Sequence, residues 1–321
     1  MSLRTQDLHV VGCYANPMRW HSRLERYLEW EEHMLDSGVQ LHVVDCTYGD
    51  RDWDVSGRPN HSKYVDYIQV KADAGALVWN KESLLNLGIN QGVPNHAKYV
   101  AWIDADIFFR RPDWAIETLH ALQHYHIIQP WEDCLDLGPK GSLLATYRSF
   151  CRQYWRRVPM RAGNAGKGIA GYEYAHTGYC WAARLRTLEN LGLLIETAAL
   201  GAADHHMAWA LLGRVDWTIP LHCTPGYKRP IKLWEKRALR YVNLNIGFLH
   251  GHVIEHKWHG RKSERGYVER WKIFERNRFD PDTDLRRNGW GVLELDDAEK
   301  PQLRHDLDAY FRLRNEDSNS L

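Results

Sequence analysis

The segment Tyr99-Val-Ala-Trp-Ile-Asp-Ala-Asp-Ile-Phe108 constrains the fold of this chain more than any other stretch. Its apolar start, residues 99–103, predicts a buried β-strand. Asp104 and Asp106 follow directly, so they would emerge on one side of the chain at the carboxyl end of that strand. Ligands of open α/β sheets bind at this end, and paired carboxylates suit a hard divalent cation that also holds phosphates. A solvated turn is the alternative, because Asp is common in turns.

The composition allows a sizeable core and shows no strong charge bias. The 321 residues suffice for one large domain or two small ones. With 42 Lys and Arg against 41 Asp and Glu, wholesale polyanion binding is disfavoured, whereas a local basic face is not. The 15 Trp and 16 Tyr suit stacking on bases and sugars as well as core packing.

The six cysteines lack C-x-x-C spacing and are interpreted as reduced thiols. Neither a signal peptide nor an apolar run long enough to cross a bilayer is recognised. We therefore expect a cytoplasmic location, in the host cytoplasm if the chain is viral.

Hydrophobic patterning predicts alternating strands and helices in the first part of the chain. Strands are expected at residues 8–14, 40–46, 64–70, 99–103 and 126–130, and helices at 19–35, 76–90 and 112–124. This alternation predicts a mostly parallel sheet covered on both faces. Neither a G-x-G-x-x-G fingerprint nor a P-loop is present, so a nucleotide bound here would be held in another way.

The second part of the chain is more irregular. Residues 138–171 are rich in Gly and Arg and are expected to loop over the site. Short helices are predicted at 182–191, 203–212 and 267–276, and a strand at 246–254, before the cluster Glu255-His-Lys-Trp-His-Gly260. No linker separates two independent domains.

Several patches resemble the nucleotide-sugar glycosyltransferases of the GT-A fold, most closely the β-1,4-galactosyltransferase-like group. Trp79-Asn-Lys-Glu-Ser-Leu-Leu-Asn-Leu-Gly-Ile89, followed by the strand and its Asp-x-Asp, resembles that group's aromatic-Asn-basic helix and metal strand. Asn16-Pro-Met-Arg19 resembles its Pro-x-Arg donor loop, and Gly201-Ala-Ala-Asp-His-His-Met207 stands where the group has its acidic acceptor-side motif. The match spans residues 8–260 in order but is dense only in these patches.

The resemblance implies an α/β fold: a GT-A (Rossmann-like) single domain with a mixed, mostly parallel sheet and a loop-rich C-terminal half. The domain would span residues 1–314, with a nucleotide-sugar-binding half at 1–130, an acceptor-binding half at 131–314 and a frayed tail at 315–321. The implied activity is metal-dependent transfer of a sugar from a nucleotide-sugar, expected to be a UDP-sugar, to an acceptor hydroxyl.

The same resemblance assigns residues to the donor. Trp79 would stack on the base, and Lys81 would lie near the uracil or the phosphates. The loop would contribute Pro17 and Arg19, with Arg19 paired to a phosphate. The alternatives are a core Trp79 on an amphipathic helix and two surface cations.

For the metal, Mn²⁺ or Mg²⁺, the resemblance implies direct binding by Asp106, with Asp104 on the metal or the ribose. A third ligand is expected late in the chain, where His256 and His259 are the candidates. Their spacing places both on one side only in a helix, whereas Gly260 favours a loop. One histidine would then bind the metal while the other contacts donor or acceptor.

Asp204 is the candidate catalytic base, which would take the proton from the acceptor hydroxyl. Gly-Ala-Ala-Asp replaces the paired acids that are usual in the group, so an inverting and a retaining reaction both stay open. A helix N-cap is the structural alternative for this residue.

Three basic segments bear on the acceptor. Residues 147–167 hold six basic residues and no acid (Arg148, Arg152, Arg156, Arg157, Arg161 and Lys167), residues 228–240 hold six against one Glu, and residues 257–278 hold eight against three Glu. Trp155, Tyr174, Trp234, Tyr241 and Trp271 lie among or beside them. This pattern suits a polyanion with stackable units, although a solvated surface would also explain it.

A looser resemblance is to the bacteriophage glycosyltransferases that decorate hydroxymethylated pyrimidines in DNA. Such a hydroxymethyl group lies in the major groove, where a basic saddle or a flipped base presents it. Two alternatives stay open: a glycosyltransferase acting on a cell-surface polysaccharide or small glycan, and a non-catalytic sugar-nucleotide or carbohydrate-binding protein.

Overall fold

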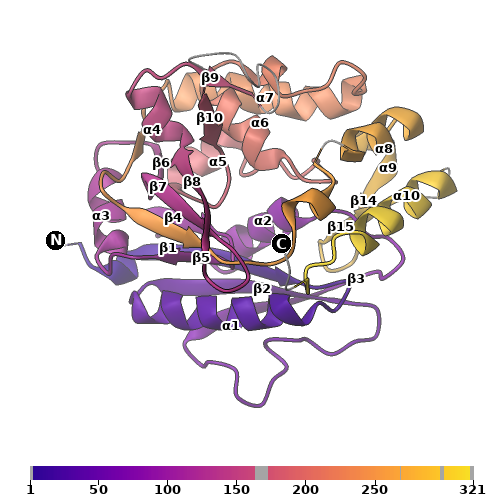
Figure 1. Ribbon diagram of the computed structural model, residues 1–321, viewed down its shortest axis with the longest axis horizontal. Coiled ribbons are helices and arrows are strands. Elements are labelled where there is room, and N and C mark those ends of the chain that lie inside the picture. Colours follow the sequence, from indigo (N-terminus) through magenta and orange to yellow (C-terminus); the bar gives the residue numbers. More distant parts are fainter. Residues whose placement is uncertain (1–2, 163–172, 268, 297–299, 319–321) are drawn as a thin grey trace.

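The computed structural model describes residues 3–162, 173–267, 269–296 and 300–318, and its main element is a seven-stranded sheet (Figure 1). The strand order is β12-β6-β11-β4-β1-β2-β3. These strands are β1 (Leu8–Ala15), β2 (Gln40–Tyr48), β3 (Val65–Ala72), β4 (Tyr99–Ile103), β6 (Ile127–Gln129), β11 (Cys180–Arg184) and β12 (Ile246–Phe248). Only β11 runs antiparallel to its neighbours, β4 and β6. The mixed, mostly parallel α/β architecture predicted from the sequence is confirmed.

Helices cover this sheet on both faces, since α1 and α2 lie on opposite sides of β1 and β2 (Figure 1). Side chains alternate along a strand, so Val10 belongs to the same core cluster as Trp30 of α1, whereas Val11 belongs to the cluster that contains Leu84 of α2. Helix α2 can lie close to β1 because Gly88 has no side chain. A Cβ at this position would come 2.6 Å from the Val11 side chain. The helices around this sheet are α1 (His21–Asp36), α2 (Lys81–Gln91), α3 (Trp114–Ala121), α5 (Leu185–Leu191), α6 (Ala203–Ala210) and α7 (Pro225–Tyr241).

A second, six-stranded sheet continues from the end of β4, in the order β5-β13-β7-β8-β10-β9. Its strands are β5 (Ile107–Phe109), β7 (Asp133–Leu137), β8 (Leu143–Ser149), β9 (Met160–Arg161), β10 (Glu173–His176) and β13 (Val253–His256). Strand β13 pairs antiparallel with β5 and parallel with β7. His256 therefore stands opposite Ile107 on one side and Asp136 on the other.

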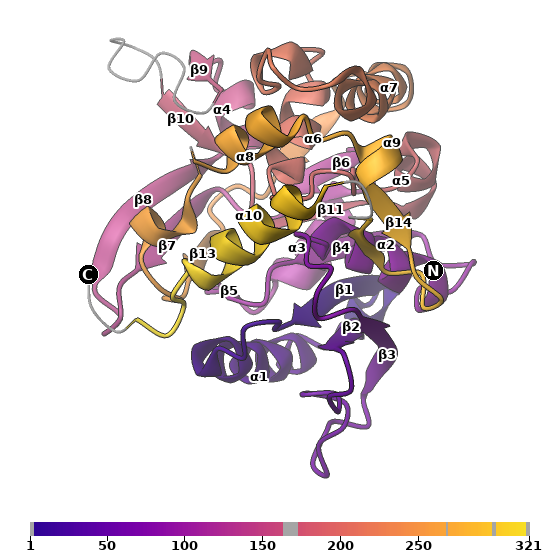
Figure 2. The same cartoon turned by 90° about the vertical axis from the view of Figure 1, so that its right-hand side faces the viewer.

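The remaining elements include a C-terminal group, which lies at the right of Figure 1. This group consists of α8 (Glu269–Asn277), α9 (Pro281–Asp284), the hairpin strands β14 (Leu285–Arg287) and β15 (Leu293–Leu295), and α10 (Pro301–Arg312), and the other elements are η1 (Thr5–Asp7), α4 (Phe150–Trp155), η2 (Val215–Trp217) and η3 (Lys262–Arg265). Figure 2 shows α10 beside α8 on the face turned toward the viewer. None of the helices in the described part of the chain combines the length and apolar character that crossing a bilayer requires.

Three expected elements differ from the structure in where they begin or in how far they extend. The helix expected from residue 76 begins only at Lys81, because the Trp79 N–H donates to the Ala199 carbonyl instead. Residues 182–184 belong to strand β11, which pairs with β4, and the helix follows at Leu185. The strand expected at 246–254 is divided by a turn at Gly251, whose φ is 72°.

The stretch expected to loop over the site, residues 138–171, is largely regular where it is described. It contains β8, which pairs with β7, and α4, which Ser149 caps by accepting from the Arg152 N–H. Residues 163–172 lie outside the described residues.

Of the tail expected to fray, residues 315–318 are described, and Glu316 among them is only 1% exposed; residues 319–321 lie outside the described residues. The halves expected at 1–130 and 131–314 share one sheet, since β11 and β12 of the second half pair within it.

Candidate active site

A cavity of about 1000 Å³ opens at the carboxyl ends of β1, β2 and β4. Its size is that of a cavity that holds a small organic ligand. Most of the predicted site residues line it, namely Pro17, Trp79, Lys81, Asp104, Asp106, Asp204, His256 and His259. Arg19 is exposed and is not among the lining residues, whereas Arg23, from the first turn of α1, is.

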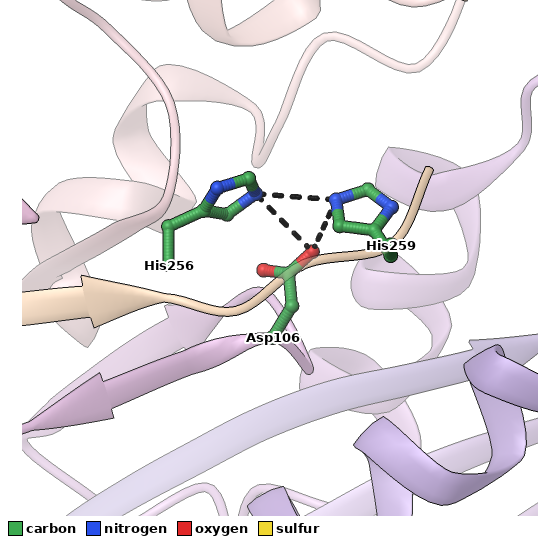
Figure 3. A group of neighbouring side chains, drawn as sticks. All are labelled: Asp106, His256 and His259. Carbon is green, nitrogen blue, oxygen red and sulfur yellow. Dashed lines mark hydrogen bonds and ion pairs between the residues drawn. The ribbon is translucent and has the colours of Figure 1, made fainter. Parts of the chain in front are cut away.

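Three of these residues form a compact group of potential metal ligands (Figure 3). Oδ2 of Asp106 lies 3.0 Å from Nε2 of His259 and 3.7 Å from Nε2 of His256. The two Nε2 atoms are 3.1 Å apart. The other carboxylate oxygen of Asp106, Oδ1, is buried without a hydrogen-bond partner in the described residues. One oxygen and two nitrogen ligands fit a divalent transition-metal ion.

Strand pairing and a tight turn bring the two histidines together. His256 ends β13, and the backbone N–H of Lys257 donates to the Asp106 carbonyl over 2.9 Å. The backbone bends at Gly260, which has a φ of 89°, and Figure 3 shows the imidazole rings of both histidines facing Asp106. A helix is therefore not required for both side chains to face one point.

Asp136 holds His256 from behind. Nδ1 of His256 donates to Asp136 over 2.7 Å, and Lys262 donates to the other carboxylate oxygen over 2.6 Å. Burial would raise the pKa of Asp136, but the bonds from His256 and Lys262 lower it to about 2. The carboxylate is thus ionised, and it directs Nε2 of His256 toward Asp106.

His259 is also in the state that metal binding requires. Burial, with a further contribution from Arg265, lowers the pKa of His259 to about 4. The imidazole is therefore neutral near pH 7, with a lone pair available for a cation.

Asp104 is held by Lys81, whose Nζ lies 3.0 Å from Oδ1 of the carboxylate. Burial raises the pKa of Asp104, and Lys81 acts against this shift. Asp104 is not part of the metal-ligand group found among the described residues. Its carboxylate lies at the cavity wall, where a ribose contact, as expected from the sequence, stays a prediction.

Trp79 is half-buried at the cavity wall, and C-terminal residues cover part of its ring. The ring of Phe311 is parallel to it within 11° at a centroid distance of 6.4 Å. The guanidinium of Arg314 lies 4.5 Å from the Trp79 centroid.

Asp204 lies in the first turn of α6 but does not cap the helix. The N-cap is Ala202, with a φ of 85° and no side-chain bond. The Asp204 carboxylate accepts from Thr177 Oγ1 over 3.3 Å, and a Cβ at Gly178 would come 2.9 Å from it. Burial opposes its ionisation, yet Lys81 and then His205 lower its pKa, so an ionised base faces the cavity.

Further lining residues were not predicted from the sequence. Burial raises the pKa of Glu82 to about 7, and this carboxylate lies 3.6 Å from Lys81. Arg265 is 6% exposed, and Nε of both Arg265 and Arg270 is buried without a hydrogen-bond partner in the described part of the chain. Sequence alone marks these arginines as members of a basic segment but does not show which ones face inward.

The basic segments are partly neutralised by acids on neighbouring elements. Arg152 and Arg156 pair with Glu132, and Arg148 pairs with Asp133. Lys167 lies outside the described residues. The members of the basic segments that line the cavity are Arg161, Lys262, Arg265 and Arg270.

Comparison with protein-family models and with curated proteins finds no match. Similar solved structures include a mannosyltransferase from Pyrobaculum calidifontis in complex with GDP-Man and Mn²⁺, at 13% identity and a TM-score of 0.44, over 83% of this chain and 60% of that one. S. aureus TarS, residues 1–349, aligns at 11% identity and a TM-score of 0.42, over 77% of this chain and 59% of that one. The catalytic domain of Drosophila β1,4-galactosyltransferase 7 in complex with xylobiose aligns at 13% identity and a TM-score of 0.40, over 92% of this chain and 98% of that one. The part of the mannosyltransferase and of TarS that aligns with this chain is less than two thirds of the length of each.

Proposed function

We propose that this chain is a metal-dependent glycosyltransferase that transfers a sugar from a nucleotide-sugar to an acceptor hydroxyl. The observation that carries the proposal is the position of two chemical groups in one cavity. A ligand group of Asp106, His256 and His259 and an ionised carboxylate at Asp204 both line it. Both are at the carboxyl side of a parallel sheet, where nucleotides bind in α/β folds.

The ligand group fits Mn²⁺ better than Mg²⁺, because Mg²⁺ prefers oxygen ligands and two of the three ligand atoms are nitrogens. When bound, the ion would supply Lewis-acid stabilisation of the charge on the leaving diphosphate. Asp106 Oδ1, which is buried without a hydrogen-bond partner among the described residues, is a further atom available to a cation.

The chain's own groups supply the remaining steps. Asp204 accepts the proton of the acceptor hydroxyl while the hydroxyl oxygen forms its bond to the anomeric carbon of the sugar. The bond from that carbon to the phosphate oxygen breaks, and its electron pair leaves with the nucleoside diphosphate. We propose that Arg265 pairs with that diphosphate, because it lines the cavity and its buried Nε has no hydrogen-bond partner in the described residues. We propose UDP as the nucleotide, with Trp79 and Lys81 on the donor side.

As the acceptor we propose a hydroxymethylated pyrimidine in DNA. Cations and aromatic rings line the same cavity as Asp204, which suits a phosphate backbone and a base that stacks. These residues are Arg161, Lys262, Arg270, Trp217, Tyr267 and Trp271. Such an acceptor would place the enzyme in the cytoplasm. A glycan is the alternative acceptor, because aromatic faces also bind sugars.

Donor hydrolysis tests the enzymatic proposal. UDP-sugars should be hydrolysed slowly with Mn²⁺ and not in excess chelator, and Asp106→Asn should abolish the metal response. A protein that binds UDP-sugar with Mn²⁺ but never turns it over would be a binding protein instead.

A salt series tests the acceptor. Affinity for hydroxymethylated DNA should fall steeply with salt, with a slope of about −0.9 in log K per phosphate contact, and Arg270→Gln should reduce that affinity. Transfer to a soluble glycan together with salt-insensitive or absent DNA binding would identify the glycan class.

A further inference from the structure

The C-terminal segment, residues 314–318, is built into the wall of the cavity. Glu316 accepts three hydrogen bonds from Arg23, at 2.6, 2.7 and 2.9 Å, and one from Nε of Arg314 at 3.0 Å. Its side chain is 1% exposed, and Arg23 and Glu316 both line the cavity. Burial would raise the pKa of Glu316, but Arg23 and Arg314 lower it to about 2, so this buried carboxylate is ionised.

Two further residues, Asp317 and Ser318, tie the segment to the rest of the protein through three hydrogen bonds. Asp317 accepts from the backbone N–H groups of His21 and Ser22, over 3.1 and 2.8 Å, at the start of α1. Nε1 of Trp258 donates to the Ser318 carbonyl over 2.6 Å. The segment is thus bonded both to the start of α1 and to Trp258, which lies between the two metal-site histidines in the sequence.

Glu316 also faces the metal-ligand group. Its Oε2 lies 4.0 Å from Nδ1 of His259, on the side of the ring opposite to the Nε2 that faces Asp106. The segment packs tightly there, because a Cβ at Gly260 would come 2.9 Å from the Glu316 Cα. A carboxylate therefore stands on the Nδ1 side of each metal-site histidine: Asp136 accepts a hydrogen bond from His256, and Glu316 lies 4.0 Å from His259, beyond hydrogen-bond distance.

Arg314 lies beside Trp79, the residue expected to stack on the nucleotide base. Arg314 is 5% exposed, its guanidinium lies 4.5 Å from the centroid of the Trp79 ring, and its Nε donates to Glu316. Arg23, Arg314 and Glu316 together carry one net positive charge, which suits the negative charge of a diphosphate. A guanidinium is planar and stacks on aromatic rings, so it also suits a nucleobase.

We propose that the C-terminal segment completes the donor and metal site, with Arg314 as a nucleotide-binding residue and Glu316 as a positioning residue for His259, Arg23 and Arg314. The proposal rests on the proposed function, since it assumes a nucleotide donor. It adds two residues from the end of the chain, beyond the patches that resemble known enzymes.

The test uses four variants of the full chain: Glu316→Gln, Glu316→Asp, Arg314→Met and, as matched control, Arg312→Met. Arg312 is exposed, ends α10 and does not line the cavity. For each variant, Mn²⁺ affinity, UDP affinity with Mn²⁺ and the melting temperature are measured, the affinities by calorimetry.

Glu316→Gln should lower Mn²⁺ affinity by about tenfold, as the loss of a group that orients a metal ligand does, and should lower UDP affinity as well. Glu316→Asp keeps the charge and should retain part of both affinities. Arg314→Met should lower UDP affinity by about tenfold and leave Mn²⁺ affinity unchanged. Arg312→Met should change neither.

Other results would overturn the proposal. If the Glu316 variants lower only the melting temperature, Glu316 is a structural anchor. If Arg314→Met raises UDP affinity, the segment obstructs the site instead of completing it. A wild-type protein that binds Mn²⁺ but no nucleotide would refute the proposed function and the role of Arg314, and Mn²⁺ affinity alone would then decide the role of Glu316. If Glu316→Gln does not fold, the same comparison is made with Glu316→Asp.

Discussion

Asp136 and His256 stand side by side on the parallel strands β7 and β13 and share a 2.7 Å hydrogen bond. Nδ1 of the imidazole donates to the carboxylate, so the lone pair is on Nε2, which points at Asp106 and His259. The tautomer of a candidate metal ligand is thus set by a residue 120 positions away in the sequence.

Asp136→Asn should lower the affinity for Mn²⁺ by about 10- to 100-fold, because an amide orients the imidazole less well and removes the charge behind it. Calorimetric titration of Mn²⁺ measures the effect. Asp133→Asn is the matched control, since Asp133 lies on the same strand and pairs with Arg148 instead. Equal Mn²⁺ affinities in wild type and Asp136→Asn would show that Asp136 serves packing alone.

Trp79→Ala should weaken UDP binding by about tenfold or more, since stacking of a base on an aromatic ring is worth roughly 1–3 kcal/mol. Part of the ring already contacts Phe311 and Arg314, so a moderate fall in melting temperature is also expected. Trp290→Ala, at a ring that is 48% exposed, is the control. A large fall in melting temperature with unchanged UDP affinity would make Trp79 a core residue.

Asp204→Asn should reduce the single-turnover rate of sugar transfer by about 10²- to 10⁴-fold, the usual contribution of a general base. UDP and Mn²⁺ affinities should persist, and stability should change little, because Asp204 makes no helix-capping bond. Glu82→Gln is the companion variant, since Glu82 also lines the cavity. Transfer that survives in Asp204→Asn but is lost in Glu82→Gln would move the base to Glu82.

Acid should destabilise the protein through Glu316, whose pKa falls from 4.5 to about 2 on folding, as Arg23 and Arg314 outweigh burial. A depressed folded-state pKa gives stability that is present above pH 4.5 and is lost as the pH falls toward 2. The difference amounts to about 3 kcal/mol in the free energy of unfolding. Urea titrations across this range should show a shallower pH dependence in Glu316→Gln. An identical dependence in both proteins would contradict the assignment.

The sequence was informative wherever a local pattern carried the signal. The apolar run 99–103 predicts β4, and the alternation of strands and helices predicts the mostly parallel sheet. Residues 182–184 were misassigned because a short buried strand and a buried helix share the same apolar composition, and only pairing with β4 distinguishes them. The polar residues of the tail resemble a solvated end, whereas within its described part, residues 315–318, Glu316 is bonded to Arg23 and Arg314.

The sequence by itself determined which residue types are available: an Asp-x-Asp at a strand end, two late histidines and an aspartate before an apolar helix. The tertiary structure decided which of them meet. It brings Asp106, His256 and His259 to one point and places Asp136 and Glu316 behind the two imidazoles. It also replaces Arg19 with Arg23 at the cavity wall. The physical reason is that ligand groups and ion pairs join residues more than 100 positions apart, whose approach depends on strand register and packing rather than on local sequence.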